Sequence, residues 1–338
     1  MDAASADELT AIAEESRDHA RRVQRDATTP VEERYPDLLE ALDWCLAAGR
    51  PDQAFRLASA LVPFWIATTR IDDGDAWFSR ALATAVADEA ARTRALHDHG
   101  YLVFWQGRYE LARQRFADSL SLAERLGDAS LQALALAGLA RVALNSDMDE
   151  AVSLLRHADA VSRDLSDSDH GRSSALHVLG VALQMSGDLL GARKVMSARL
   201  AMGRSSGDQF IVWVESANLS MVERQLGHLD RAEQLILQAL TIDSTRGDEM
   251  SIAWTINGLA AVTAAKGAHQ RAATLVGIAA AMLERAGGQW PPDERKQHEE
   301  TLSTLTTALS PDELRDALTR GAGLSVTDAV AFALAVPG

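Results

Sequence analysis

Histidine, acidic and hydroxyl side chains cluster at four places in this 338-residue chain, and each cluster could in principle do metal or acid–base chemistry. The run His-Asp-His at 97–99 places two imidazoles beside one carboxylate. The run His-Glu-Glu at 298–300 places one imidazole beside two carboxylates. Asp-Asp-Gly-Asp at 72–75 groups three carboxylates, and Ser-Asp-Ser-Asp at 166–169 sets hydroxyls beside acids.

None of these four runs has the spacing that its chemistry needs. Two histidines at i and i+2 lie on different faces of a helix, so those at 97 and 99 are poorly placed to share a metal. The run at 298–300 lacks a second histidine, and the acids at 72–75 fall where a helix start favours them. The run at 166–169 is typical of a turn with caps. We therefore predict no catalytic residue, no metal, no cofactor and no enzymatic activity.

Composition excludes some classes of partner and indicates the compartment in which the protein works. The chain has 33 Lys and Arg against 48 Asp and Glu, a net charge of −15, so it is a poor candidate for direct nucleic-acid binding. Its single cysteine, Cys45, excludes an internal disulfide and indicates a reducing compartment. No apolar run reaches the roughly 18 residues of a membrane helix. We expect a cytoplasmic protein that does not enter a membrane.

Glycines repeat with a period of 40 residues over the middle of the chain, and they set the elements that position any site. One series is Gly107, Gly187, Gly227 and Gly267. Such a period indicates an array of helix–turn–helix units, with glycine in the left-handed position that ends a helix. Around Ala140 the expected glycine is replaced by Asp147, which predicts a turn one residue shorter.

The spacing within each unit resembles the tetratricopeptide repeat (TPR). A small residue is followed by Gly seven positions later and Ala five after that, as in Ser220, Gly227 and Ala232. The opening YPDLLEALDWCLAAGRPDQAFRLASALVPFW and the ending RAATLVGIAAAMLERAGGQWPPDERKQHEETLSTLTTAL resemble the sensor domain of large bacterial, actinobacterial-type transcriptional regulators of the MalT-like, LuxR-type and antibiotic-regulator class. The resemblance covers about residues 31–335, without the ATPase and DNA-binding modules.

The resemblance implies an all-α fold, a TPR-like α-α superhelix with a short helical C-terminal cap. We expect N-terminal helices in 1–50, about six hairpins in 51–288 and the cap in 289–338, starting after the sequence GGQWPP. Pro63 falls inside the apolar helix expected at 52–69, where proline frees a carbonyl or kinks the helix.

The resemblance also implies which side chains line the concave surface of the array. They combine aromatic, amide, imidazole and guanidinium groups, a mixture that suits a ligand groove. The set is Arg94, His97, Tyr101, Trp105, Arg141, Asn145, His177, Gln184, Met221, Arg224, Trp254 and Asn257.

The sequence thus favours a non-catalytic sensor module, part of or related to a bacterial transcriptional regulator, that binds a small molecule, peptide or protein in its groove. One alternative is a protein–protein scaffold that uses the convex face or the ends. Another is an enzyme or resistance protein with a helical cavity. The apolar region near Phe64 and Trp65 also leaves a homodimer open.

Overall fold

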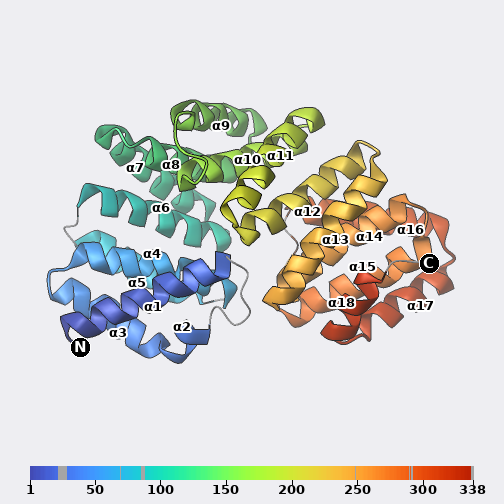
Figure 1. The fold of residues 1–338 in the computed structure, drawn as a ribbon, viewed down its shortest axis with the longest axis horizontal. Coiled ribbons are helices and arrows are strands. Elements are labelled where there is room, and N and C mark those ends of the chain that lie inside the picture. Colours follow the sequence, from blue (N-terminus) through green and yellow to red (C-terminus); the bar gives the residue numbers. More distant parts are fainter. Residues whose placement is uncertain are drawn as a thin grey trace. The chain divides into compact units, whose positions relative to one another are not determined.

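A computed structural model describes residues 1–21, 29–68, 70–84, 88–247, 249–288, 290 and 292–335. These residues form 18 α-helices and no strand (Figure 1), which confirms the expected all-α class. The helices fall into two compact units, the first containing α1 to α10 and the second α11 to α18. Within the described ranges, no helix combines the length and the apolar character needed to cross a membrane.

The two units differ in the number of helices that they contain. The first unit contains α1 (Ala3–Arg21), α2 (Thr29–Glu33), α3 (Tyr35–Ala47), α4 (Pro51–Ala67), α5 (Ile71–Thr84), α6 (Glu89–Trp105), α7 (Tyr109–Leu126), α8 (Ala129–Ala143), α9 (Met148–Ser162) and α10 (His170–Met185). The second contains α11 (Leu189–Ser206), α12 (Gln209–Gln225), α13 (Leu229–Arg246), α14 (Glu249–Ala265), α15 (His269–Arg285), α16 (Pro292–Ala308), α17 (Pro311–Ala322) and α18 (Val326–Leu334).

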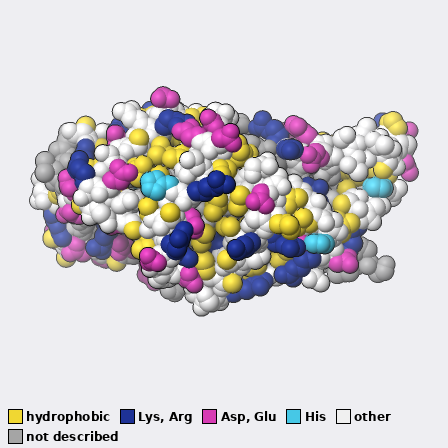
Figure 2. Space-filling model, turned by 90° about the horizontal axis from the view of Figure 1, so that it is seen from above, with side chains coloured by type: hydrophobic (Ala, Val, Ile, Leu, Met, Phe, Trp, Pro, Cys, Tyr) yellow, Lys and Arg dark blue, Asp and Glu magenta, His cyan; other side chains and the backbone are white. Residues whose placement is uncertain are grey.

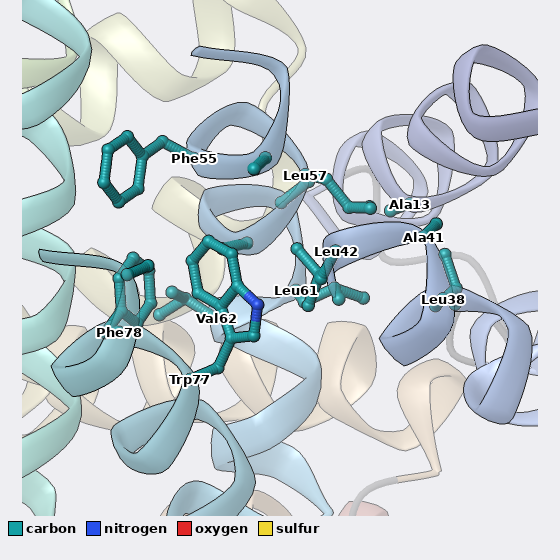
Figure 3. Close-up of a cluster of buried hydrophobic side chains, with 14 of the residues drawn as sticks. Ala13, Leu38, Ala41, Leu42, Phe55, Leu57, Leu61, Val62, Trp77 and Phe78 are labelled. Atoms are coloured by element: carbon teal, nitrogen blue, oxygen red, sulfur yellow. The ribbon is translucent and has the colours of Figure 1, made fainter. Parts of the chain in front are cut away.

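The N-terminal helices share one apolar core. Figure 3 shows side chains from α1, α3, α4 and α5 meeting in it, among them the fully buried Leu42, Leu61 and Phe78. Helix α4 runs through Pro63, whose side chain is exposed, so the missing N–H lies on the solvent side of the helix. Burial of the opposite face holds α4 together across this break.

Glycine geometry confirms the repeat and its irregularity. Gly107, Gly187, Gly227 and Gly267 all have positive φ, which a side chain would oppose. The helices after them begin 40 residues apart or a multiple of it, whereas α9 begins at Met148, one residue early. Asp147 accepts a hydrogen bond from the backbone N–H of Glu150 and so caps α9 in place of a glycine turn. The predicted one-residue slip is therefore present.

In the second unit the hairpins α12/α13 and α14/α15 are followed by the C-terminal helices. Helix α17 packs closely on α15 because two glycines leave room for backbone atoms. A Cβ on Gly277 would lie 2.1 Å from the carbonyl oxygen of Leu318, and one on Gly321 the same distance from that of Thr274. Helix α17 thus caps the last hairpin, as expected, while α16 packs mainly against α14.

Two parts of the sequence prediction are not tested by this fold. Gln289 and Pro291, in the expected joint before the cap, lie outside the described residues. The division of the chain into 1–50, 51–288 and 289–338 stays a prediction.

Candidate binding faces

One row of aromatic side chains runs along α6. His97, Tyr101 and Trp105 are spaced by four residues, which puts them on one side of a helix. The rings of His97 and Tyr101 are nearly parallel with centroids 6.4 Å apart, and Tyr101 meets Trp105 edge to face at 6.1 Å. From α8, the guanidinium of Arg141 lies 5.6 Å from the centre of the Tyr101 ring. We call these four side chains the α6–α8 face.

Exposure increases along this row. His97 is 8% exposed, Tyr101 is half-buried, and Trp105 is 41% exposed. The α6–α8 face therefore has a fixed inner end and an outer end that presents an indole to solvent. A role for Trp105 in contacts with a partner stays a prediction.

A buried ion pair fixes the inner end of the face. Asp98 is 4% exposed, and the Nε of Arg94 lies 3.0 Å from both of its carboxylate oxygens. The Nδ1 of His97 lies 3.0 Å from the same carboxylate. Burial raises the pKa of Asp98, but Arg94, His97 and the hydroxyl of Ser59 outweigh it and hold the pKa well below its usual range. Burial lowers the pKa of His97, so this imidazole is neutral near pH 7.

The other predicted groove residues of the first unit have different surroundings. The guanidinium of Arg94 is engaged by Asp98. The side-chain amide of Asn145 donates to the carbonyls of Arg141 and Val142 and so satisfies the end of α8. His177 and Gln184 lie half-buried on α10. A role for these residues in binding stays a prediction.

Two of the four predicted groove residues of the second unit contact α16 of the C-terminal segment. Asn257 is fully buried and bonded to Glu294 and His298 of α16. Arg224 is half-buried, with its Nη2 3.5 Å from Gln297 of the same helix. Met221 is buried and Trp254 is half-buried. In this structure α16 covers the part of the face formed by Arg224 and Asn257. The sequence marked these positions but gave no sign of what covers them.

The histidine of the 97–99 run that lies away from this face belongs to a cluster that the sequence analysis did not anticipate. The buried His99 directs its Nε2 to Asp75 at 2.8 Å and to the hydroxyl of Ser79 at 3.5 Å. A catalytic triad needs the serine and the acid on opposite ring nitrogens. Because both approach the same nitrogen and Nδ1 is buried, this arrangement cannot activate the serine. Among the described side chains, no three His, Cys, Asp or Glu residues are grouped as metal ligands.

A cavity of about 480 Å³ lies between α11, α12 and α13 and was also missed by sequence reasoning. Its lining combines four apolar side chains with two guanidinium groups, two hydroxyl groups and one carboxylate. The lining residues are Ser197, Leu200, Ala201, Arg204, Ser205, Leu219, Glu223, Arg231 and Leu235. One feature of the sequence could have indicated this cavity: α11 has four basic residues and no acidic one in an otherwise acidic chain.

Surface charge is mixed despite the net negative charge. On the face drawn in Figure 2, Lys and Arg side chains lie among acidic ones and between apolar patches. Local basic sites are therefore compatible with the overall charge of −15.

Comparison with known proteins supports the fold. No protein-family model and no curated protein matches the chain. Among solved structures, the Rap protein complexed with Competence and Sporulation Factor is similar, with a TM-score of 0.58 and 14% identity over 98% of this chain and 95% of that one. The apo quorum sensor NprR from B. thuringiensis has a TM-score of 0.52 and 12% identity over 85% of each chain. BtubC from P. vanneervenii has a TM-score of 0.50 and 16% identity over 62% and 91%. The chain has a TPR-like helical-repeat fold.

Proposed function

We propose that this protein is a non-catalytic sensor module that binds a peptide or protein segment on its α6–α8 face. The observation that carries the proposal is the guanidinium of Arg141 over the ring of Tyr101, in an aromatic row that ends at the exposed Trp105. Aromatic rings supply contact area at a low entropy cost, and a guanidinium anchors a carboxylate with two hydrogen bonds. A segment with an apolar side chain beside an acidic one fits this face.

The face is also held in place before any ligand arrives. The carboxylate of Asp98 holds the ring of His97 through its Nδ1, and His97 stacks on Tyr101. Side chains that are already ordered lose little further freedom on binding, which favours affinity. This support explains why a buried ion pair lies directly behind an exposed aromatic surface.

The similar structures make a peptide signal the favoured ligand class. Rap was solved with Competence and Sporulation Factor, and NprR is described as a quorum sensor. We further propose a cytoplasmic role as the signal-sensing part, or a stand-alone relative, of a bacterial transcriptional regulator. Reading the coding sequence upstream in the same frame tests this finer proposal, because an ATPase and a DNA-binding module are expected there.

The binding proposal is tested with a displayed library of random linear peptides selected on the intact protein. Peptides that bind the wild type should lose about 5- to 30-fold in affinity with Tyr101→Ala or Arg141→Ala, since anchors of this kind contribute about 1–2 kcal/mol. The controls are Tyr109→Ala, which removes an exposed tyrosine outside the row, and Arg156→Ala on α9. Equal peptide binding by all four variants would show that the α6–α8 face is not the binding site.

The cavity between α11, α12 and α13 favours a second candidate, binding of a small molecule. Arg204 and Arg231 line this cavity together with three leucines, a combination that suits an amphipathic carboxylate whose acid pairs with the guanidinium groups and whose chain lies on the leucines. A panel of medium-chain fatty acids should raise the melting temperature of the wild type but not of Arg204→Ala/Arg231→Ala. A rise of the same size in both proteins would place the carboxylate elsewhere.

A further inference from the structure

Helix α16 departs from the pattern of the array. In the second unit the helix after a hairpin packs against the second helix of that hairpin, as α14 does on α13. After α15, however, that place is taken by α17. Helix α16 instead packs mainly on α14, and its residue Gln297 reaches Arg224 on α12. It therefore covers side chains that a regular array would leave available for a ligand.

Asn257 of α14 holds α16 as a receptor would hold a peptide. Its amide nitrogen donates both to the backbone carbonyl of Glu294 at 3.2 Å and to the carboxylate of Glu294 at 2.8 Å. Its amide oxygen lies 3.0 Å from Nδ1 of His298, and Nδ1 donates because an amide oxygen can only accept. Trp290 stacks on that imidazole with ring centroids 4.9 Å apart. One fully buried asparagine thus forms hydrogen bonds with a backbone carbonyl, a carboxylate and an imidazole.

The contact is polar and incompletely satisfied. Gln297 is 3% exposed and donates to Glu294 at 3.3 Å, while Arg224 reaches it only at 3.5 Å. The Nε of Arg224 and the Nε1 of Trp254 are buried without a hydrogen-bond partner in the described structure. Burial also lowers the pKa of Arg224, against the attraction of Glu300 and Glu294. Buried donors without acceptors are unfavourable, so another segment could satisfy this face better than α16 does.

The helices beyond α16 are anchored independently. Helix α17 is held on α15 by the close approach at Gly277 and Gly321. Helix α18 is held by Arg271, whose guanidinium donates to the carbonyls of Phe332, Ala333 and Ala335 at its C-terminal end. Release of α16 from α14 therefore does not require these contacts to break.

We propose that α12 and α14 form a second peptide-binding face, that α16 occupies it as an internal ligand, and that a helical segment of a partner displaces α16. The partner segment carries an acid at the place of Glu294, an amide three residues later and an imidazole after that, as in the run Glu-Arg-Lys-Gln-His at 294–298. This face shares no residue with the α6–α8 face, so the inference does not rest on the proposed function.

The test uses a fluorescein-labelled peptide of residues 290–309 and the full chain, with binding measured by anisotropy. The wild type should bind it weakly, because its own α16 competes from within the same molecule. Glu294→Ala removes the carboxylate only from the internal copy, so this variant should bind the peptide at least tenfold more tightly, equivalent to about 1.4 kcal/mol. Glu299→Ala, on the exposed side of α16, is the matched control and should behave as the wild type.

Three outcomes decide the proposal. Adding Asn257→Ala to Glu294→Ala should abolish the gain; a gain that survives it, or equal binding by all variants, overturns the proposal. Should Glu294→Ala not fold, hydrogen exchange on the wild type decides instead: α16 amides should exchange at least tenfold faster than those of α17, and equal rates overturn it. Tyr101→Ala in the Glu294→Ala background should leave peptide binding unchanged, which separates this result from the proposed function.

Discussion

Replacing Arg199 by alanine should destabilise the second unit by about 3–5 kcal/mol. Arg199 on α11 is 6% exposed and Glu215 on α12 is 0% exposed, and the two are joined by a charge-assisted hydrogen bond. The substitution leaves the Glu215 carboxylate in the α11–α12 interface without its guanidinium partner. Because a buried charge that loses its ion-pair partner costs much more than an exposed pair contributes, the loss should be large against a typical total stability of about 5–15 kcal/mol.

The assay is urea unfolding followed by tryptophan fluorescence and circular dichroism. With a slope of about 1–3 kcal/mol per molar urea, the expected loss moves the transition of the second unit by about 1 M or more. Arg204→Ala is the matched control on the same helix, since Arg204 is exposed and bonds only to Gln238 among the described side chains. Its transition should move by no more than about 0.5 kcal/mol.

The double variant Arg199→Met/Glu215→Leu distinguishes the cost of the buried charge from the cost of lost packing. Replacing both charges by apolar groups of similar volume removes the buried carboxylate together with its guanidinium, so stability should return to within about 1 kcal/mol of the wild type. A double variant as unstable as Arg199→Ala would refute the explanation, because the loss would then come from packing rather than from the buried charge. A single variant that loses less than about 1 kcal/mol would refute it as well.

Three further perturbations test other features. Gly277→Ala forces a methyl against the carbonyl of Leu318 and should cost about 1–3 kcal/mol in urea unfolding; no loss would contradict the close helix crossing. Burial lowers the pKa of His97 and of His99, so the unfolded chain takes up protons first, and stability should fall as pH drops below about 6.5. Their carboxylate partners take up protons only below about pH 4. A His97→Gln/His99→Gln variant should therefore lose less stability than the wild type between about pH 7 and 5. Arg271→Ala should speed limited proteolysis within α18, because three carbonyls at its end lose their donor.

Local signals predicted the fold well. The glycine series marked the hairpin turns because only glycine adopts positive φ without strain, and all four glycines have it. The small residues marked close helix crossings: a Cβ on Gly100 would lie 2.9 Å from the ring of Phe116. Even the shortened turn before Met148 was readable, because Asp147 replaced a glycine and can cap a helix.

The sites were less predictable because they depend on which segments meet in space. His97 and Tyr101 could be placed on one side of α6 from their spacing, and Arg141 came from the next repeat at the same position. The partner of His97, Asp98, is its neighbour in sequence, yet nothing in the sequence showed that both are buried. The bonds from Asn257 to Glu294 could not be derived either, because they depend on α16 leaving the regular stack. Periodicity describes an array, and α16 does not follow it.

The shortened turn before α9 has a practical consequence. Helix α9 begins one residue early and α10 one residue late, 41 residues after α8, while α11 at Leu189 and α12 at Gln209 are back in the 40-residue register. The connection at 163–169 lies between the early helix and the late one. A length change in this connection is thus absorbed where it occurs. That makes 163–169 a suitable position for inserting a reporter domain or a protease site, because the neighbouring hairpins already tolerate a difference in spacing there.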